Sequence, residues 1–124
     1  MRLSEIRYDT GLPVDGYGPG FFRIGGAVHR GAVLLTAQGV APWGGLEDAA
    51  PLLALAGAVD VLFIGTGDET EHLPAGLRAR LDAAGIGVEA MASAPACRGY
   101  NVLLSEARRI AAALLPVTQP PGRA

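Results

Sequence analysis

The chain has 124 residues and a mass of 12.7 kDa, and 50% of its residues are hydrophobic while 18% are charged. This composition is typical of one globular domain and excludes a disordered, highly charged chain. The formal net charge of −2 predicts no basic face for nucleic acid, and because all ten basic residues are arginine, a lysine Schiff base and a P-loop lysine are excluded.

The first half of the chain predicts turns and short strands. Residues 1–20 are rich in Gly and Pro and predict an irregular arm on the surface. Residues 21–24 and 27–30 predict the two strands of a hairpin, because Gly25-Gly26 between them tolerates the positive φ angles of a tight turn. A strand, a loop and a helix are then expected at residues 32–36, 38–45 and 46–56, respectively.

The middle of the chain predicts a strand–helix–strand unit. Residues 59–64 are an almost continuous apolar run, which is typical of a strand buried on both faces. Residues 77–84 predict a short helix, and residues 86–91 predict the next strand. Elements in this order predict a right-handed crossover between parallel strands.

The strongest helical periodicity follows Ser93, which is the predicted N-cap of a last helix. Apolar residues recur there at intervals of three and four, so they are expected to form one buried stripe. Glu106 and Arg109 are expected to form an ion pair on the helix surface. The predicted buried stripe consists of Tyr100, Leu103, Ala107, Ile110 and Leu114.

A candidate ligand site lies where the strand at residues 59–64 ends and the last helix begins. Ligands of α/β sheets bind at the carboxyl ends of strands, and the N–H groups of a helix start favour an anion. The Gly-x-Gly turn after this strand is also consistent with a simple tight turn. The candidate ligand-binding residues are Gly65, Thr66, Gly67, Ser93, Cys97, Arg98 and Asn101.

No catalytic residue, cofactor or metal site is predicted. Cys97, the only cysteine, lies beside Arg98 at a helix start, and both features would lower the pKa of its thiol. A buried packing role is nevertheless favoured over a nucleophile, because neither histidine can be placed near it. A second charged group consists of Asp68, Glu69, Glu71 and His72. A solvated loop is favoured over a cation site there, because the spacing of these residues matches no calcium loop.

Several of these segments resemble a known family. Gly65-Thr66-Gly67 is followed by Ala96-Cys97-Arg98-Gly99-Tyr100-Asn101, and the early Tyr-Gly pair, the Phe-x-Ile strand and the Pro-Trp loop are similar too. Over residues 1–115 the chain is similar to the Mth domain-of-unknown-function family, which includes a mitochondrial complex I assembly factor and an adipogenesis-associated protein. The family often has Asp-Thr in place of Ala92-Ser93 and Thr in place of Gly99.

The resemblance implies one α/β domain, which we place at residues 1–117. The composition of residues 118–124, with two prolines and a glycine, predicts a disordered tail. The resemblance implies three layers, with a central mixed sheet, flanking helices and a small β-hairpin layer. It also implies a non-enzymatic adaptor or assembly factor. A cytoplasmic location is expected because the sequence predicts no signal peptide and its single cysteine allows no internal disulfide. The implied partner is a protein, either a respiratory-complex subunit or another assembly factor, and peripheral association with a membrane is compatible with this role.

The alternative is an enzyme or a small-anion-binding protein. It would use the crevice between Gly65–Gly67 and the start of the last helix. A deep pocket containing Arg98 would favour this alternative, whereas a shallow surface with exposed apolar side chains would favour the adaptor.

Overall fold

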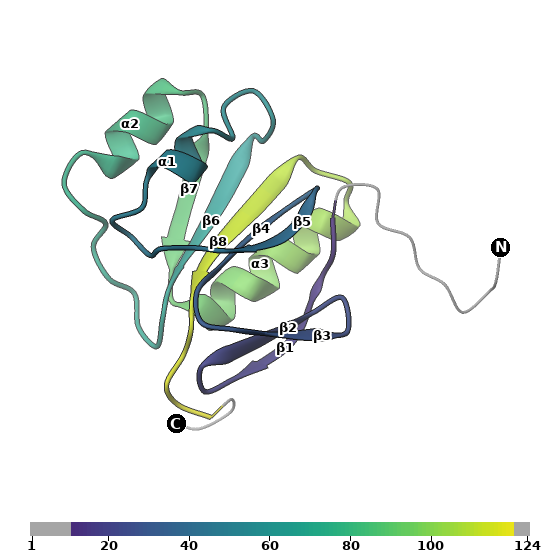
Figure 1. The fold of residues 1–124 in the computed structure, drawn as a ribbon. Coiled ribbons are helices and arrows are strands. Elements are labelled where there is room, and N and C mark those ends of the chain that lie inside the picture. Colours follow the sequence, from purple (N-terminus) through teal and green to yellow (C-terminus); the bar gives the residue numbers. More distant parts are fainter. Residues whose placement is uncertain (1–10, 121–124) are drawn as a thin grey trace, which may run out of the picture.

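The computed structural model describes residues 11–120, which form two β-sheets and three helices (Figure 1). The larger sheet comprises β4 (Val33–Thr36), β5 (Gly39–Pro42), β6 (Val61–Thr66), β7 (Gly87–Met91) and β8 (Ile110–Leu115) in the order β5-β4-β8-β6-β7. The smaller comprises β1 (Val14–Gly18), β2 (Phe21–Ile24) and β3 (Ala27–Arg30) in the order β1-β2-β3. The helices are α1 (Ala50–Leu53), α2 (Leu77–Ala83) and α3 (Ser93–Ser105).

β8 lies at the centre of the five-stranded sheet. It pairs antiparallel with β4 and parallel with β6, and β6 also pairs parallel with β7, so the sheet is mixed as predicted. Alternate side chains of a strand point to opposite faces. Ala112 therefore packs in one hydrophobic cluster, while Ala111 and Ala113 pack in the other. These small side chains let a packed layer approach each face of the sheet closely.

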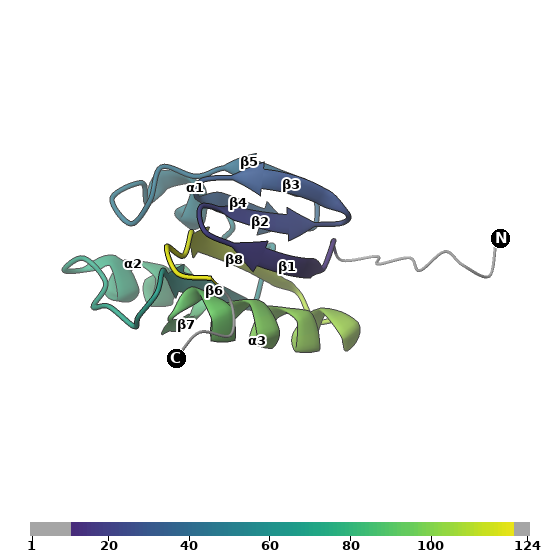
Figure 2. The same cartoon turned by 90° about the horizontal axis from the view of Figure 1, so that it is seen from below.

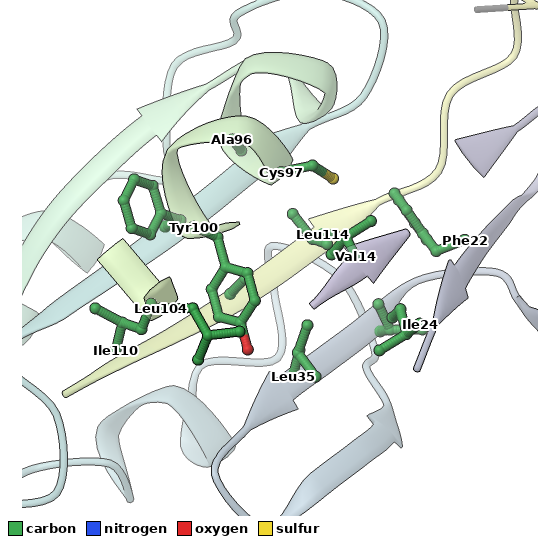
Figure 3. Close-up of a cluster of buried hydrophobic side chains, with 13 residues drawn as sticks. Val14, Phe22, Ile24, Leu35, Ala96, Cys97, Tyr100, Leu104, Ile110 and Leu114 are labelled. Carbon is green, nitrogen blue, oxygen red and sulfur yellow. The ribbon is translucent and has the colours of Figure 1, made fainter. Parts of the chain in front are cut away.

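The two faces of the central sheet carry different layers, which confirms the predicted three-layer α/β architecture. Helix α3 and the three-stranded sheet cover one face, and α1 and α2 lie over the other (Figure 2). On the first face Tyr100 and Phe22 are fully buried together (Figure 3). On the second face Leu52 and Leu81 are fully buried. Each such side chain contributes about 1.5–3 kcal/mol to folding.

The hairpin and the crossover are confirmed. β2 and β3 pair antiparallel, and the glycines between them, Gly25 and Gly26, have φ angles of 58° and 86°. Both positive angles are those of the tight hairpin turn that the glycine pair predicts. The segment β6–α2–β7 joins two parallel strands through a helix, in the predicted order. Local sequence signals were sufficient for these elements.

The prediction of an irregular arm at residues 1–20 is wrong for residues 14–18, which form strand β1. Residues 1–10 lie outside the part of the chain that the structure describes. β1 pairs antiparallel with β2, and a distant helix holds its first residue. The Asn101 side chain accepts a hydrogen bond from Val14 N (2.9 Å) and donates one to Val14 O (2.8 Å). The Tyr100 hydroxyl donates to Leu12 O (2.9 Å). These contacts span more than eighty positions, which is why a local pattern missed the strand.

The predicted loop at residues 38–45 contains β5, which forms a hairpin with β4. The predicted helix at residues 46–56 is reduced to the four residues of α1. Its first half is a turn, because the Trp43 indole donates to Asp48 O (3.1 Å) and the Asp48 carboxylate accepts from Gly44 N (3.1 Å). These bonds hold Asp48 in the turn that precedes α1.

The predicted last helix is correct only in its first part. Helix α3 ends at Ser105, and the apolar residues at 110–114 belong to strand β8. A short buried apolar run can form either a helix or a strand. Here residues 110–115 form a strand because they pair with β6 in the sheet. Within α3 Leu104 is buried and Leu103 only partly so. Glu106 does not hold Arg109, whose guanidinium pairs instead with Asp60 (2.7 Å).

Ala107 lies just after α3, exposed and in a left-handed conformation with φ = 58°, so its predicted place in the buried stripe is wrong. Its N–H donates to Leu104 O (3.0 Å), and Arg108 N–H donates to Leu103 O (3.1 Å). These two bonds form the Schellman motif, in which the left-handed position, here Ala107, is usually occupied by glycine. A Cβ atom in this conformation costs about 1–2 kcal/mol.

Replacing Ala107 by glycine is therefore expected to stabilise the protein. The gain in the free energy of unfolding should be about 0.5–1 kcal/mol, because relief of strain exceeds the entropy that glycine adds to the unfolded chain. Urea unfolding of Ala107→Gly measures it. Ala79→Gly, at an exposed position inside α2, is the matched control and should destabilise by about 0.5–1 kcal/mol. Loss of stability in both variants would contradict the strain at Ala107.

Candidate functional site

The turn after β6 meets the start of α3, as predicted from the parallel crossover. Ser93 N–H donates to Gly67 O (2.8 Å), and Gly67 N–H donates to the Ser93 hydroxyl (2.9 Å). The same hydroxyl donates to Leu115 O at the end of β8 (2.5 Å). One side chain thus connects the ends of two central strands with the helix, a set of contacts that we call the Ser93 junction.

Ser93 has this role because it is the first residue of α3 and not its N-cap. The N-cap is Ala92, and no side chain caps the helix. Ser93 is fully buried. The predicted capping function is therefore wrong, because the hydroxyl is turned toward β6 and β8 and away from the N–H groups of its own helix.

The crevice between the turn and the helix is closed by these contacts. A Cβ atom at Gly65 would lie 2.7 Å from Ser93 Oγ and 2.9 Å from Ser93 Cα, so glycine is required for the helix to approach the strand. The Gly67 N–H, which the sequence suggested as an anion donor, is bonded to Ser93. Gly65 and Gly67 thus serve the packing of β6 against α3.

Thr66 shapes the loop that follows β6. Its hydroxyl donates to Glu69 O (2.6 Å), accepts from Glu71 N–H (3.1 Å) and lies 3.1 Å from Met91 O at the end of β7. The residue is 6% exposed. The hydroxyl is engaged on several sides by the backbone, which fixes the acidic loop at the carboxyl edge of the sheet.

A hollow of about 310 Å³ opens beside this loop, and its charge disfavours an anion. Three acidic residues, Asp68, Glu69 and Glu71, are among those that line it, and no basic residue does. Hydrogen bonds from the hydroxyl and N–H of Thr118 hold the pKa of Asp68 below its usual value and tie residue 118, the first of the predicted tail, to the domain. Within residues 11–120 no group of three potential metal ligands is found.

Cys97 is buried, 4% exposed, in the cluster between α3 and the sheets (Figure 3). Burial raises the pKa of its thiol to about 12, and the opposing effect of Arg98 is smaller. The expectation of a lowered pKa from Arg98 and the helix start is therefore wrong, because desolvation disfavours the thiolate more than these positive groups favour it. A protonated thiol in this position fits the packing role.

The remaining two candidate residues point to different parts of the fold. Arg98 is exposed on α3 and does not line the acidic hollow. Asn101 binds both backbone groups of Val14 and so fixes β1. The structure thus brings Gly65, Gly67 and Ser93 together and turns Asn101 toward β1, and binding of a ligand by the seven candidate residues stays a prediction.

A second hollow, of about 410 Å³, lies beside β7 and was missed from the sequence. The chain before α2, the start of α2 and Ala90 of β7 surround it. It contains Arg78, Glu71 and His72. The loop residues were recognised as a charged group, but Arg78 gave no signal, since only the crossover brings it to β7.

Comparison with known proteins identifies relatives over nearly the whole chain. The family model described as "Protein of unknown function (DUF498/DUF598)" matches residues 14–115. An uncharacterized protein of Rhodobacter capsulatus is 58% identical over 117 residues, which are 94% of this chain and 94% of that protein. The NADH dehydrogenase (ubiquinone) 1 alpha subcomplex assembly factor 3 of Danio rerio is 32% identical over 123 residues, which are 94% of this chain and 71% of that protein.

Solved structures share the fold. A crystal structure described as an outer membrane protein from Bartonella henselae has a TM-score of 0.79 and 35% identity, over 90% of this chain and 99% of that one. A solution structure from Bordetella pertussis, described as a Mth938-like domain, has a TM-score of 0.75 and 28% identity, over 98% and 96%. In this chain, no helix among residues 11–120 has the length and apolar character needed to cross a bilayer.

The Ser93 junction predicts a large loss of stability in Ser93→Ala. Gly67 N–H and Leu115 O would lose their partner, and an unsatisfied buried group costs about 1–3 kcal/mol, so we expect a loss of about 2–4 kcal/mol in the free energy of unfolding. Urea unfolding monitored by circular dichroism measures it.

Ser105→Ala is the matched control for this variant. Ser105 is exposed at the end of the same helix, and its hydroxyl bonds only to Val102 O. Its replacement should change the free energy of unfolding by less than about 0.5 kcal/mol. Equal effects of the two serine variants would refute the structural role of the junction.

Proposed function

We propose that this chain, which belongs to the DUF498/DUF598 family of proteins of unknown function, is a non-enzymatic assembly factor of respiratory complex I. The similarity to the complex I assembly factor of Danio rerio carries this proposal, since it extends over 94% of the chain. The human assembly factor of the same name is 32% identical over 130 residues. The partner would be a subunit of the complex or another assembly factor.

The contacts at the predicted crevice support binding rather than catalysis. Gly67 N–H and the Ser93 hydroxyl, which a catalytic site would direct at a substrate, bond to each other. The thiol of Cys97, with a pKa of about 12, stays protonated at neutral pH and is a poor nucleophile. The surface around the acidic loop at Asp68–Glu71 is therefore the part of this sheet edge that would contact a partner protein. A cytoplasmic location with peripheral membrane association remains a prediction.

Deletion of the gene in its native organism tests the proposal. Native gel electrophoresis of the membranes should show severalfold less assembled complex I, with a matching loss of NADH:ubiquinone oxidoreductase activity. Expression of the wild-type chain should restore both. Succinate oxidation in the same membranes is the internal control and should not change, because it bypasses complex I. Complex I at the parental amount and activity in the deletion strain would contradict the proposal.

A further inference from the structure

The outer edge of β7 has backbone groups available for an added strand. β7 is the last strand of the five-stranded sheet (Figure 1), so alternate residues direct their N–H and C=O groups away from β6. Gly87 N–H bonds to Asp60 O on the β6 side. By alternation Val88 and Ala90 face outward, and Ala90 lines the hollow of about 410 Å³.

Side chains already bond to this edge at both ends. Arg78 Nη1 donates to Val88 O (3.1 Å), which confirms that Val88 faces outward. At the other end Ala92 N–H donates to the Thr70 hydroxyl (3.2 Å). Ala90 lies midway between the two bonds. These bonds occupy Val88 O and Ala92 N–H, so the outward N–H and C=O groups of Ala90 between them are the ones to which a residue of an antiparallel strand would bond.

The two ends of the hollow carry opposite charges. Arg78 is at the Val88 end, and Glu71, next to Thr70, is at the Ala92 end. A guanidinium has five N–H donors and binds a carboxylate through two of them, so Arg78 can hold a carboxylate as well as Val88 O. A strand antiparallel to β7 would end at Arg78 and have its upstream residues at Glu71.

The opposite edge of the sheet is less suited to strand addition. β5, the other outer strand, contains Pro42, which has no N–H to donate. β7 contains no proline, and its register with β6 runs without a bulge from Gly87 to Met91. These are the features that a strand needs to accept a partner strand.

We propose that the hollow beside β7 binds the extended C-terminal peptide of a partner protein. The terminal carboxylate binds Arg78, the peptide backbone bonds to Ala90, and a basic residue upstream of the terminus pairs with Glu71. The volume of about 410 Å³ lies within the range of ligand pockets. This inference rests on the proposed partner-binding function and names the part of the partner that is recognised.

The experiment is a titration of the full-length ¹⁵N-labelled chain with a defined probe. The probe is the peptide acetyl-Lys-Ala-Val-Ala-Val with a free carboxylate, compared with the same peptide ending in an amide. The free carboxylate should shift the amide signals of Thr70, Arg78 and Ala90. The amide form should bind about tenfold more weakly, because it lacks the charged partner of Arg78. Equal affinity for the two peptides, or no shift at this edge, overturns the proposal.

Arg78→Ala should weaken binding of the free-carboxylate peptide by about tenfold and leave the amide peptide unchanged. Arg80→Ala is the matched control, since Arg80 is an exposed arginine of the same helix that does not line the hollow. It should bind like the wild type, and equal losses in both variants would overturn the role of Arg78. The titration is independent of complex I. A chain that restores complex I in the deletion strain but binds neither peptide overturns the peptide site and leaves the proposed function standing.

Discussion

The Ser93 hydroxyl fixes the carboxyl edge of the central sheet. It accepts from Gly67 N–H after β6 and donates to Leu115 O at the end of β8, while its backbone begins α3. The close approach needs Gly65, because any side chain there would meet Ser93. The helix held in this way brings Asn101 to the first residue of β1 and Tyr100 to Leu12 just before it, so the position of the small sheet depends on the same junction.

The Ser93 junction occupies this edge of the sheet, so the proposed peptide site lies on the chain between β6 and β7. Thr66 holds the start of that segment, and Thr70 and Arg78 attach it to the outer strand. The segment therefore presents charged side chains on a fixed frame. A binding protein gains affinity from such a frame, because little conformational entropy is lost when the partner arrives.

The sequence predicted those parts of the fold that local signals determine. The glycine pair at Gly25 defined a hairpin, and the apolar run before Gly65 defined a buried strand. β1 was missed because its partner Asn101 is far away in sequence, and β8 was assigned to a helix because its alanine-rich run suits both structures. For the site, topology alone placed the turn beside the last helix. Only side-chain distances show that the Ser93 hydroxyl fills the space between them.

Native-state hydrogen exchange tests the central claim that the Ser93 junction is part of the rigid fold. The Gly67 amide should exchange as slowly as that of Ala112 in the middle of β8, because its bond to Ser93 should open only when the whole domain unfolds. A Gly67 amide that exchanges much faster than Ala112 would show that the turn opens by itself. The predicted crevice would then be accessible to a ligand, and the junction would not be the constraint that fixes this edge of the sheet.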